Sequence, residues 1–322
     1  MKGKAAILVL SSLAGCAVPA YAWGCEGHQV VALVAWQFLT EHARSMTEML
    51  QQQFPPDANL RHYCKGDEKL PVIAQVATWA DDYRTEHPET APWHYVNIPL
   101  EMPVGDGKAQ CASGCITVAV TDQYAILRAA PGAVNEQSST ALRFVIHFLG
   151  DMHQPLHVED NGDQGGNCVP VQYLGEKPKL EHGKYSPELH AVWDTNLVEA
   201  AMSEAKSKEV SDYAEHLAML ASQNRTEWSQ GTRADWIAEG HALAQTVAYG
   251  ELESSPPLAN LAQAIAGPAG LEKCSDSHYD QSVLEKHLAI TSQYVRDAGG
   301  KAETQLAKAG LRLANMLNAI WP

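Results

Sequence analysis

Apolar side chains recur every three to four positions along most of this chain of 322 residues, the spacing that gives an α-helix one buried face. Stretches rich in proline and glycine separate these segments and end helices. A short strand is expected at residues 169–174, and no repeat or linker divides the chain. The pattern therefore predicts an all-α fold, a single-domain multi-helix bundle with at most a small β-ribbon. The predicted helices cover residues 26–53, 71–84, 117–130, 138–154, 188–202, 211–222, 234–249, 281–297 and 301–319.

Residues 141–157 combine this helical spacing with three histidines and an aspartate. His147 and Asp151 are four positions apart and therefore lie on one helix face, which the neighbouring apolar residues place toward the core. Buried ionisable groups are costly unless they are paired or bind metal, and zinc accepts both imidazole and carboxylate. Pro155 ends or bends the helix, so that His157 can approach from another direction. The segment favours a zinc site, although chance alone gives roughly two His-x3-Asp or His-x3-Glu pairs in a chain with 14 histidines and 38 acidic residues.

The first 22 residues have the composition of a secretory signal peptide. Two lysines precede an apolar run, and Ala20-Tyr21-Ala22 has the small-residue pattern of a cleavage site. Cleavage after Ala22 gives a mature domain of residues 23–322 that is secreted or periplasmic. A lipid anchor at Cys16 is the competing interpretation, because residues 13–16 also resemble a lipoprotein cleavage box. No other apolar run is long enough to span a bilayer.

Six of the seven cysteines remain after the leader is removed. An even number in an exported chain predicts three disulfides, which could be connected in 15 ways. The short spacing of Cys111 and Cys115 favours a local loop bridge over a metal-binding knuckle.

The chain is strongly acidic. Its formal charge of −15 becomes −17 when Lys2 and Lys4 leave with the leader. Such a surface has no electrostatic footprint for duplex DNA. A polyanionic substrate must therefore be held locally, and bound cations are the obvious means.

Further motifs bring tryptophan, histidine and aspartate together at several points of the chain. They resemble, in the same order, the zinc-dependent single-strand-specific nucleases of fungi, plants and bacteria, which share a superfamily with zinc phospholipase C. The resemblance covers residues 23–194. The motifs are Trp23 five residues before His28, then Trp79-Ala80-Asp81, Trp93-His94-Tyr95, His147-x3-Asp151-x5-His157 and His190-x2-Trp193-Asp194.

The resemblance implies a cofactor of three zinc ions held by nine residues. The first zinc would be bound by Asp81, His94, His147 and Asp151, the second by His157, His190 and Asp194, and the third by the amine and carbonyl of Trp23, His28 and the other side of Asp151. The third site needs cleavage after Ala22, because only then does Trp23 have a free amine that zinc can deprotonate. His153 lies inside the same motif but matches no ligand, and we expect it to support the site or to pack in the core.

The resemblance also implies an activity and its substrate contacts. The expected enzyme is a monomer that hydrolyses single-stranded DNA and RNA to 5′-phosphate products and also acts on 3′-nucleotides, without a protein nucleophile. Asp81 is expected to orient the attacking water, and Arg84 and Asn167 to contact the phosphate. Tyr95 resembles the residue on which an unpaired base stacks. Asn97 stands where some members have aspartate, which leaves the base preference open.

Two alternatives remain at this point. A zinc phospholipase C uses the same kind of metal site, but there the spacing from the terminal tryptophan to the first histidine is longer and the last ligand is typically glutamate. Here the spacing is five and the last ligand is Asp194. The second alternative is a protein that binds zinc or single strands without cleaving them. The spacing and Asp194 favour the nuclease over the phospholipase, and the nine filled ligand positions favour an enzyme over a protein that only binds.

Overall fold

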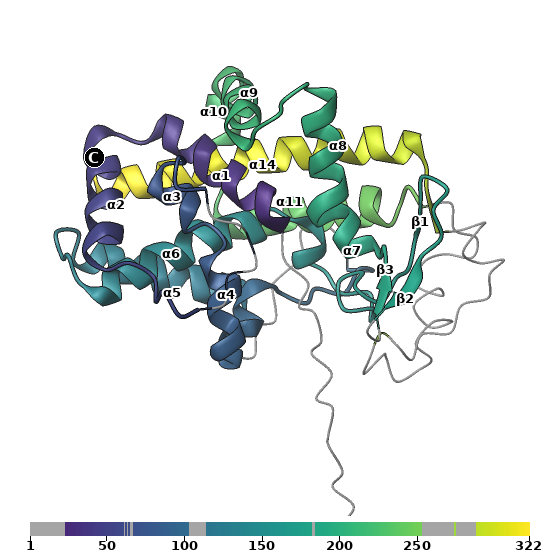
Figure 1. Cartoon of the computed structure of the whole chain (residues 1–322), viewed down its shortest axis with the longest axis horizontal. Coiled ribbons are helices and arrows are strands. Elements are labelled where there is room, and N and C mark those ends of the chain that lie inside the picture. Colours follow the sequence, from purple (N-terminus) through teal and green to yellow (C-terminus); the bar gives the residue numbers. More distant parts are fainter. Residues whose placement is uncertain are drawn as a thin grey trace, which may run out of the picture.

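The computed structural model describes residues 23–60, 62, 64, 67–102, 114–181, 184–252, 274 and 288–322. Helices form nearly all of the regular structure in this part of the chain (Figure 1). The predicted leader, residues 1–22, lies outside it. The longer helices are α1 (Gly24–Phe38), α2 (Glu41–Gln53), α4 (Trp79–Glu86), α5 (Ile116–Ala129), α6 (Glu136–Asp151), α8 (Leu197–Glu204), α9 (Val210–Gln223), α11 (Arg233–Leu243) and α14 (Ser292–Ile320).

Short helical pieces connect these helices near the centre of the molecule. They are α3 (Val72–Gln75), α7 (Leu189–Ala191), α10 (Arg225–Trp228), the 3₁₀ turns η1 (Pro88–His94) and η2 (Pro155–His157), and the π-helical turns η3 (Val192–Asn196) and η4 (Ala244–Ala248). Strands are few in the described residues. β1 (Gln172–Tyr173) pairs in parallel with β4 (Ala289–Ile290), and β2 (Lys179–Glu181) pairs in antiparallel with β3 (Lys184–Ser186). The prediction of an all-α fold with at most a small β-ribbon is confirmed.

The close packing of α1 against α14 forms the centre of the core. In Figure 1, α14 runs across the width of the molecule and α1 crosses in front of it. The buried face of α1 includes Val30, Val31 and Val34. Gly310 lets the two backbones approach, because a Cβ atom at this position would lie 2.5 Å from Val34 Cβ and 2.8 Å from the Val31 carbonyl oxygen. This packing buries Gly27 and His28 near the start of α1.

We expect Gly310→Ala to lower the free energy of unfolding by about 1–3 kcal/mol, because an added methyl group in this tight contact forces the helices apart. Gly300→Ala in the same helix is the matched control. Nothing lies within 4 Å of a Cβ atom at Gly300, so alanine there should stabilise by about 0.5–1 kcal/mol through helix propensity. Urea denaturation of both variants measures the difference. Equal effects of the two substitutions would contradict the packing argument.

The single helix predicted for residues 26–53 is wrong, since the chain forms two helices there. Leu39 is extended and Thr40 caps α2, accepting a hydrogen bond from the Ala43 N–H at 3.0 Å. The apolar spacing continues across the break because both helices pack on the same core. A threonine that caps a helix therefore outweighs the continuous pattern.

Other helix boundaries also differ from the prediction. Residues 71–84 form α3 and the start of α4 instead of one helix. α6 begins at Glu136 and not at 138, because Asn135 caps it by accepting a hydrogen bond from the Ser138 N–H. The helices predicted at 281–297 and 301–319 are joined, since α14 is continuous from Ser292 to Ile320, and residues 281–287 lie outside the described part.

Two disulfides link distant parts of the described chain, Cys25 to Cys64 and Cys168 to Cys274. The expected Cys111–Cys115 bridge falls outside the described residues, because Cys111 does. Within those residues, no helix combines the length and the apolar composition that crossing a bilayer requires.

Candidate metal centre

The C-terminal half of α6 carries two ionisable side chains into the core. His147 and Asp151 are fully buried, and His147 Nε2 lies 3.2 Å from Asp151 Oδ2, as the four-residue spacing predicts. The His147 ring is fixed from behind, because its Nδ1 is 2.8 Å from the Ala77 carbonyl oxygen. That contact makes Nδ1 the hydrogen-bond donor, so Nε2, which faces Asp151, is the nitrogen that can bind a cation.

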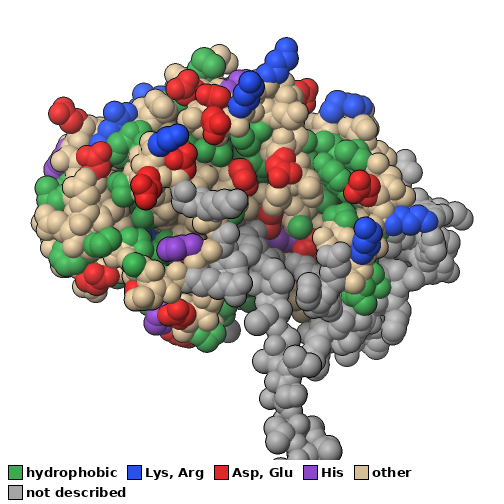
Figure 2. Space-filling model, viewed as in Figure 1, with side chains coloured by type: hydrophobic (Ala, Val, Ile, Leu, Met, Phe, Trp, Pro, Cys, Tyr) green, Lys and Arg blue, Asp and Glu red, His purple; other side chains and the backbone are tan. Residues whose placement is uncertain are grey.

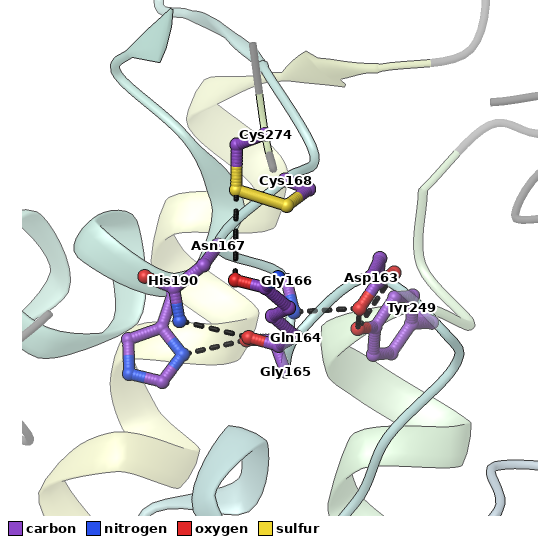
Figure 3. The surroundings of a disulfide bond; sticks show 9 residues. All are labelled: Asp163, Gln164, Gly165, Gly166, Asn167, Cys168, His190, Tyr249 and Cys274. Carbon is purple, nitrogen blue, oxygen red and sulfur yellow. Dashed lines mark hydrogen bonds between the residues drawn. A yellow bond between two sulfur atoms is a disulfide. The ribbon is translucent and has the colours of Figure 1, made fainter. Parts of the chain in front are cut away.

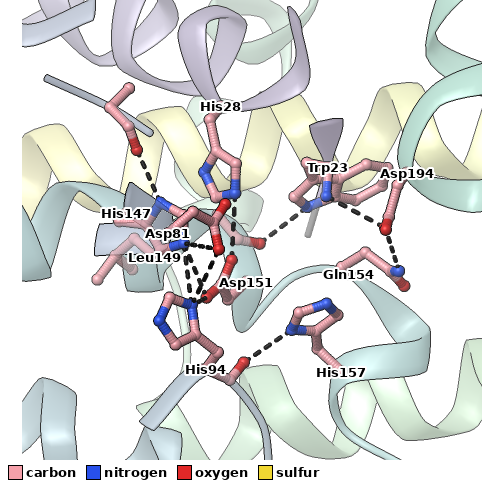
Figure 4. A network of polar contacts seen from close by, with 12 residues as sticks. Trp23, His28, Asp81, His94, His147, Leu149, Asp151, Gln154, His157 and Asp194 are labelled. Atoms are coloured by element: carbon pink, nitrogen blue, oxygen red, sulfur yellow. Dashed lines mark hydrogen bonds and ion pairs between the residues drawn. The ribbon is translucent and has the colours of Figure 1, made fainter. Parts of the chain in front are cut away.

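Two further elements complete what we call the first group, Asp81, His94, His147 and Asp151 (Figure 4). His94, at the end of η1, places Nδ1 3.0 Å from Asp151 Oδ2 and 3.1 Å from His147 Nε2. Asp81, in the first turn of α4, places Oδ1 3.7 Å from each of these histidine nitrogens. Donor atoms from three elements therefore converge on one point.

His28 reaches the same aspartate from the opposite side. It projects from α1, and its Nε2 lies 3.2 Å from Asp151 Oδ1 while its ring stacks on His147 at 3.9 Å between centroids. Gly150 makes room for this ring, because a Cβ atom there would lie 2.8 Å from His28 Nδ1. The two oxygens of Asp151 thus face different histidines, which is the arrangement of a bridging carboxylate.

His157, His190 and Asp194 form the second group. His157 Nε2 and His190 Nε2 are 3.1 Å apart, and His190 Nε2 is 3.2 Å from Asp194 Oδ2. Each histidine is oriented through its other nitrogen, His157 by the His94 carbonyl oxygen at 2.7 Å and His190 by the Gly165 carbonyl oxygen at 2.5 Å. The contact between His157 and His94 places the two groups side by side.

Trp23 lies at the second group, directly before α1. It is completely buried, and its indole N–H donates to the Gly150 carbonyl oxygen at 2.8 Å. Its main-chain nitrogen is 3.2 Å from Asp194 Oδ1. Two members of the predicted third site, His28 and Asp151, therefore contact each other. The third member is Trp23, whose main-chain nitrogen contacts Asp194 of the second group.

Unsatisfied buried atoms show whether these residues suit a metal. Within the described part of the chain, His28 Nε2 and Asp151 Oδ1 are buried and make no hydrogen bond, although they are only 3.2 Å apart. Such atoms are costly to bury without a partner. A cation between them would satisfy both lone pairs, and imidazole nitrogen with carboxylate oxygen is a donor set that zinc accepts. The residues therefore fit zinc.

The protonation of the histidines also suits a metal. Burial lowers the pKa of His94 to about 4. Burial and the nearby His147 also lower the pKa of His28, so both rings are neutral at pH 7 and can offer a nitrogen lone pair to a metal. Burial acts in the same direction on His147, but the charges of Asp151 and Asp81 outweigh it and raise its pKa to about 9. A cation bound by the first group would displace this one proton.

The predicted substrate residues lie around this centre. Arg84 Nη2 is 3.1 Å from Asp81 Oδ1, and 11% of the Arg84 side chain is exposed. Tyr95 directly follows His94 and is 40% exposed, and Asn97 is exposed two residues further on. Asn167 follows the Gly165-Gly166 turn and is half-buried. The face drawn in Figure 2 carries many acidic side chains and no continuous basic stripe among its described residues.

Some residues of the site were missed from the sequence. Gln154 is buried and donates through Nε2 to Asp194 Oδ1 at 2.7 Å, so it helps to orient a predicted ligand. Its position inside the 147–157 motif was the available signal. His153 is buried and contacts the Leu149 carbonyl oxygen at 2.7 Å and Arg312 Nη1 at 2.8 Å, so it packs in the core, which is one of the two roles expected for it.

Comparison with known proteins gives the family. The sequence model described as S1/P1 Nuclease matches residues 23–322, and the chain belongs to this family of nucleases. It is 28% identical to nuclease S1 of Aspergillus oryzae over 98% of this chain and 96% of that protein. It is 26% identical to nuclease P1 of Penicillium citrinum over 92% and 97%, and 25% identical to endonuclease 2 of Arabidopsis thaliana over 94% and 91%.

Proposed function

We propose that this protein is an exported, zinc-dependent endonuclease that hydrolyses single-stranded DNA and RNA to products ending in 5′-phosphate and also acts on 3′-nucleotides. The observation that carries the proposal is Asp151, whose oxygens face His28 on one side and His94 with His147 on the other. Family membership supports the reaction class, since the relatives compared above are named nucleases or endonucleases.

The nine predicted ligands divide among three zinc ions as the resemblance implies. Asp81, His94, His147 and Asp151 would hold one, His157, His190 and Asp194 another, and Trp23, His28 and Asp151 the third. Bound zinc supplies a Lewis acid that polarises phosphate oxygen and lowers the pKa of water toward 7.

Asp81 and Arg84 are placed to act together on the phosphate and the water. Asp81 Oδ1 faces the histidines of the first group, so this carboxylate can accept a hydrogen bond from the attacking water and orient it. Arg84 lies 3.1 Å from the same oxygen and reaches the surface, so its guanidinium can donate to a phosphate that enters beside the first group. Asn167 would donate to the phosphate from the side of the second group.

Tyr95 gives a physical reason for preferring single strands. Its ring is exposed next to His94, so a base can stack on it only when that base is not paired inside a duplex. Asn97, two residues further along the chain, is also exposed and would contact the edge of the base. Base stacking beside a buried metal centre selects unpaired nucleotides regardless of their sequence.

For this reason we expect Tyr95→Ala to raise KM for single-stranded DNA by about 5- to 150-fold, which corresponds to the loss of about 1–3 kcal/mol of stacking, with a smaller effect on kcat. Tyr95→Phe is the matched control, since it keeps the ring and should keep KM. Steady-state kinetics on one oligonucleotide measure both. A change confined to kcat would contradict a stacking role.

Export is proposed on two grounds. The disulfides of the described chain are typical of an oxidising compartment, and the Ala20-Tyr21-Ala22 pattern predicts cleavage before Trp23. Trp23 would then be the first residue of the mature enzyme, as the proposed third zinc site requires. We propose that the mature enzyme is a monomer.

The deciding experiment is metal analysis of the secreted protein, with its first residue determined, followed by assays on single- and double-stranded DNA. We expect about three zinc ions per chain, a first residue of Trp23, and cleavage of the single strand that a chelator stops and zinc restores. Release of phosphocholine from lipid emulsions without action on denatured DNA would instead support a phospholipase. Bound zinc without either activity would indicate a binding protein.

A further inference from the structure

A left-handed turn lies between the two metal-ligand histidines of the second group. Gln164, Gly165 and Gly166 have φ angles of 59°, 62° and 77° in succession (Figure 3). Left-handed backbone is unfavourable for a residue with a side chain, so Gln164 is held there against its own preference. Gly165 could not be replaced, because a Cβ atom would lie 2.5 Å from the Leu156 carbonyl oxygen. The turn therefore needs contacts that fix it.

Asp163 supplies these contacts from the residue before the turn. Its Oδ1 accepts a hydrogen bond from the Gly166 N–H at 2.7 Å, which closes the turn. Its carbonyl oxygen accepts from the Cys168 N–H at 3.0 Å, on the residue tied by a disulfide to Cys274. The Asp163 side chain is buried, so its position depends on the residues packed around it.

Tyr249 determines where the Asp163 carboxyl group lies. It directly follows η4, in the last third of the chain, and is buried. Its hydroxyl oxygen lies 2.9 Å from Asp163 Oδ1 and 2.9 Å from Glu159 Oε1. Two buried carboxyl groups thus share one hydroxyl between them. Without that hydroxyl both would lose a partner in a water-excluded environment, which favours a rearrangement.

The turn in its observed form orients a predicted ligand. Gly165 presents its carbonyl oxygen 2.5 Å from His190 Nδ1, as Figure 3 shows. This hydrogen bond keeps the proton on Nδ1 and directs Nε2 to His157 and Asp194, at 3.1 and 3.2 Å. Loss of a partner of this kind typically weakens metal binding by about 10- to 100-fold.

We propose that Tyr249 is a positioning residue for the second group, acting through Asp163 and the 164–166 turn on the orientation of His190. The inference rests on the proposed zinc-dependent function and assigns a role to the part of the chain beyond Asp194, where the sequence motifs end.

Tyr249→Phe tests the inference in the full mature protein, because it removes one hydroxyl and keeps the ring. Tyr213→Phe is the matched control, since Tyr213 is also fully buried but its hydroxyl makes no hydrogen bond to any residue that the structure describes. Two quantities are measured. The first is the zinc retained per chain against a graded chelator. The second is the His190 imidazole N–H signal of the zinc-free protein labelled with ¹⁵N-histidine, assigned with His190→Gln.

For Tyr249→Phe we expect one zinc equivalent to bind about 10- to 100-fold more weakly while the others stay unchanged, and the His190 N–H signal to be lost to exchange with water. Tyr213→Phe should match the wild type in both. Wild-type behaviour of Tyr249→Phe, or an equal and general loss in both variants, would overturn the inference. A wild-type protein that takes up no zinc would overturn the proposed function, and the zinc-free imidazole signal would still decide the role of Tyr249.

Discussion

Asp151→Ala is expected to remove two of the three zinc ions and nearly all nuclease activity. The reason is geometric, since Asp151 Oδ1 faces His28 and Asp151 Oδ2 faces His94 and His147. Removing this carboxylate also leaves three imidazoles in a buried space without the negative charge that balances a cation. A metal ion contributes several kcal/mol of transition-state stabilisation, so kcat/KM should fall about a thousandfold or more.

Metal content and kinetics are measured together for this variant. Asp122→Ala is the control, because Asp122 lies on the exposed face of α5 and should keep all zinc and all activity. Full zinc content in Asp151→Ala would remove the bridging assignment, whatever the activity. Loss of one zinc alone would place Asp151 in a single site.

One extra residue in front of Trp23 should remove most of the nuclease activity without unfolding the protein. The added residue turns the terminal amine into an amide, whose nitrogen lone pair is delocalised into the carbonyl and no longer binds metal. Trp23 is completely buried and its nitrogen lies 3.2 Å from Asp194 Oδ1, so the added residue would also have to fit beside the second group. We expect the loss of one zinc equivalent and of most of the activity.

The same residue added after Pro322, which is exposed, is the control for the extension. Circular dichroism should give equal helix content for both extended proteins and the wild type, because the helices do not depend on the terminal amine. The first residue must be verified by mass spectrometry. Full activity with the extra residue still present would refute Trp23 as a ligand and remove the reason for requiring cleavage after Ala22.

The helical nature of the fold was predictable because it depends on the local spacing of apolar residues. The positions where one helix ends and the next begins were not, because each depends on a single capping side chain. The apolar period runs through residues 26–53 without interruption, yet Leu39 is extended and Thr40 starts a new helix. Periodicity records which residues face the core and does not record whether the backbone hydrogen bonds continue between them. One side-chain hydrogen bond to the Ala43 N–H decides the boundary.

The candidate site also has one part that the sequence predicts and another that depends on tertiary packing. The sequence by itself determined that His147 and Asp151 share a helix face, because the geometry of a helix follows from the backbone alone. It also determined which residue types could bind a cation. Only the tertiary structure decided that His28 and His94 meet Asp151 and that Asp81 meets His94 and His147, because such contacts depend on packing between distant segments. The same holds for Tyr249, which no local pattern connects with Asp163, 86 residues away.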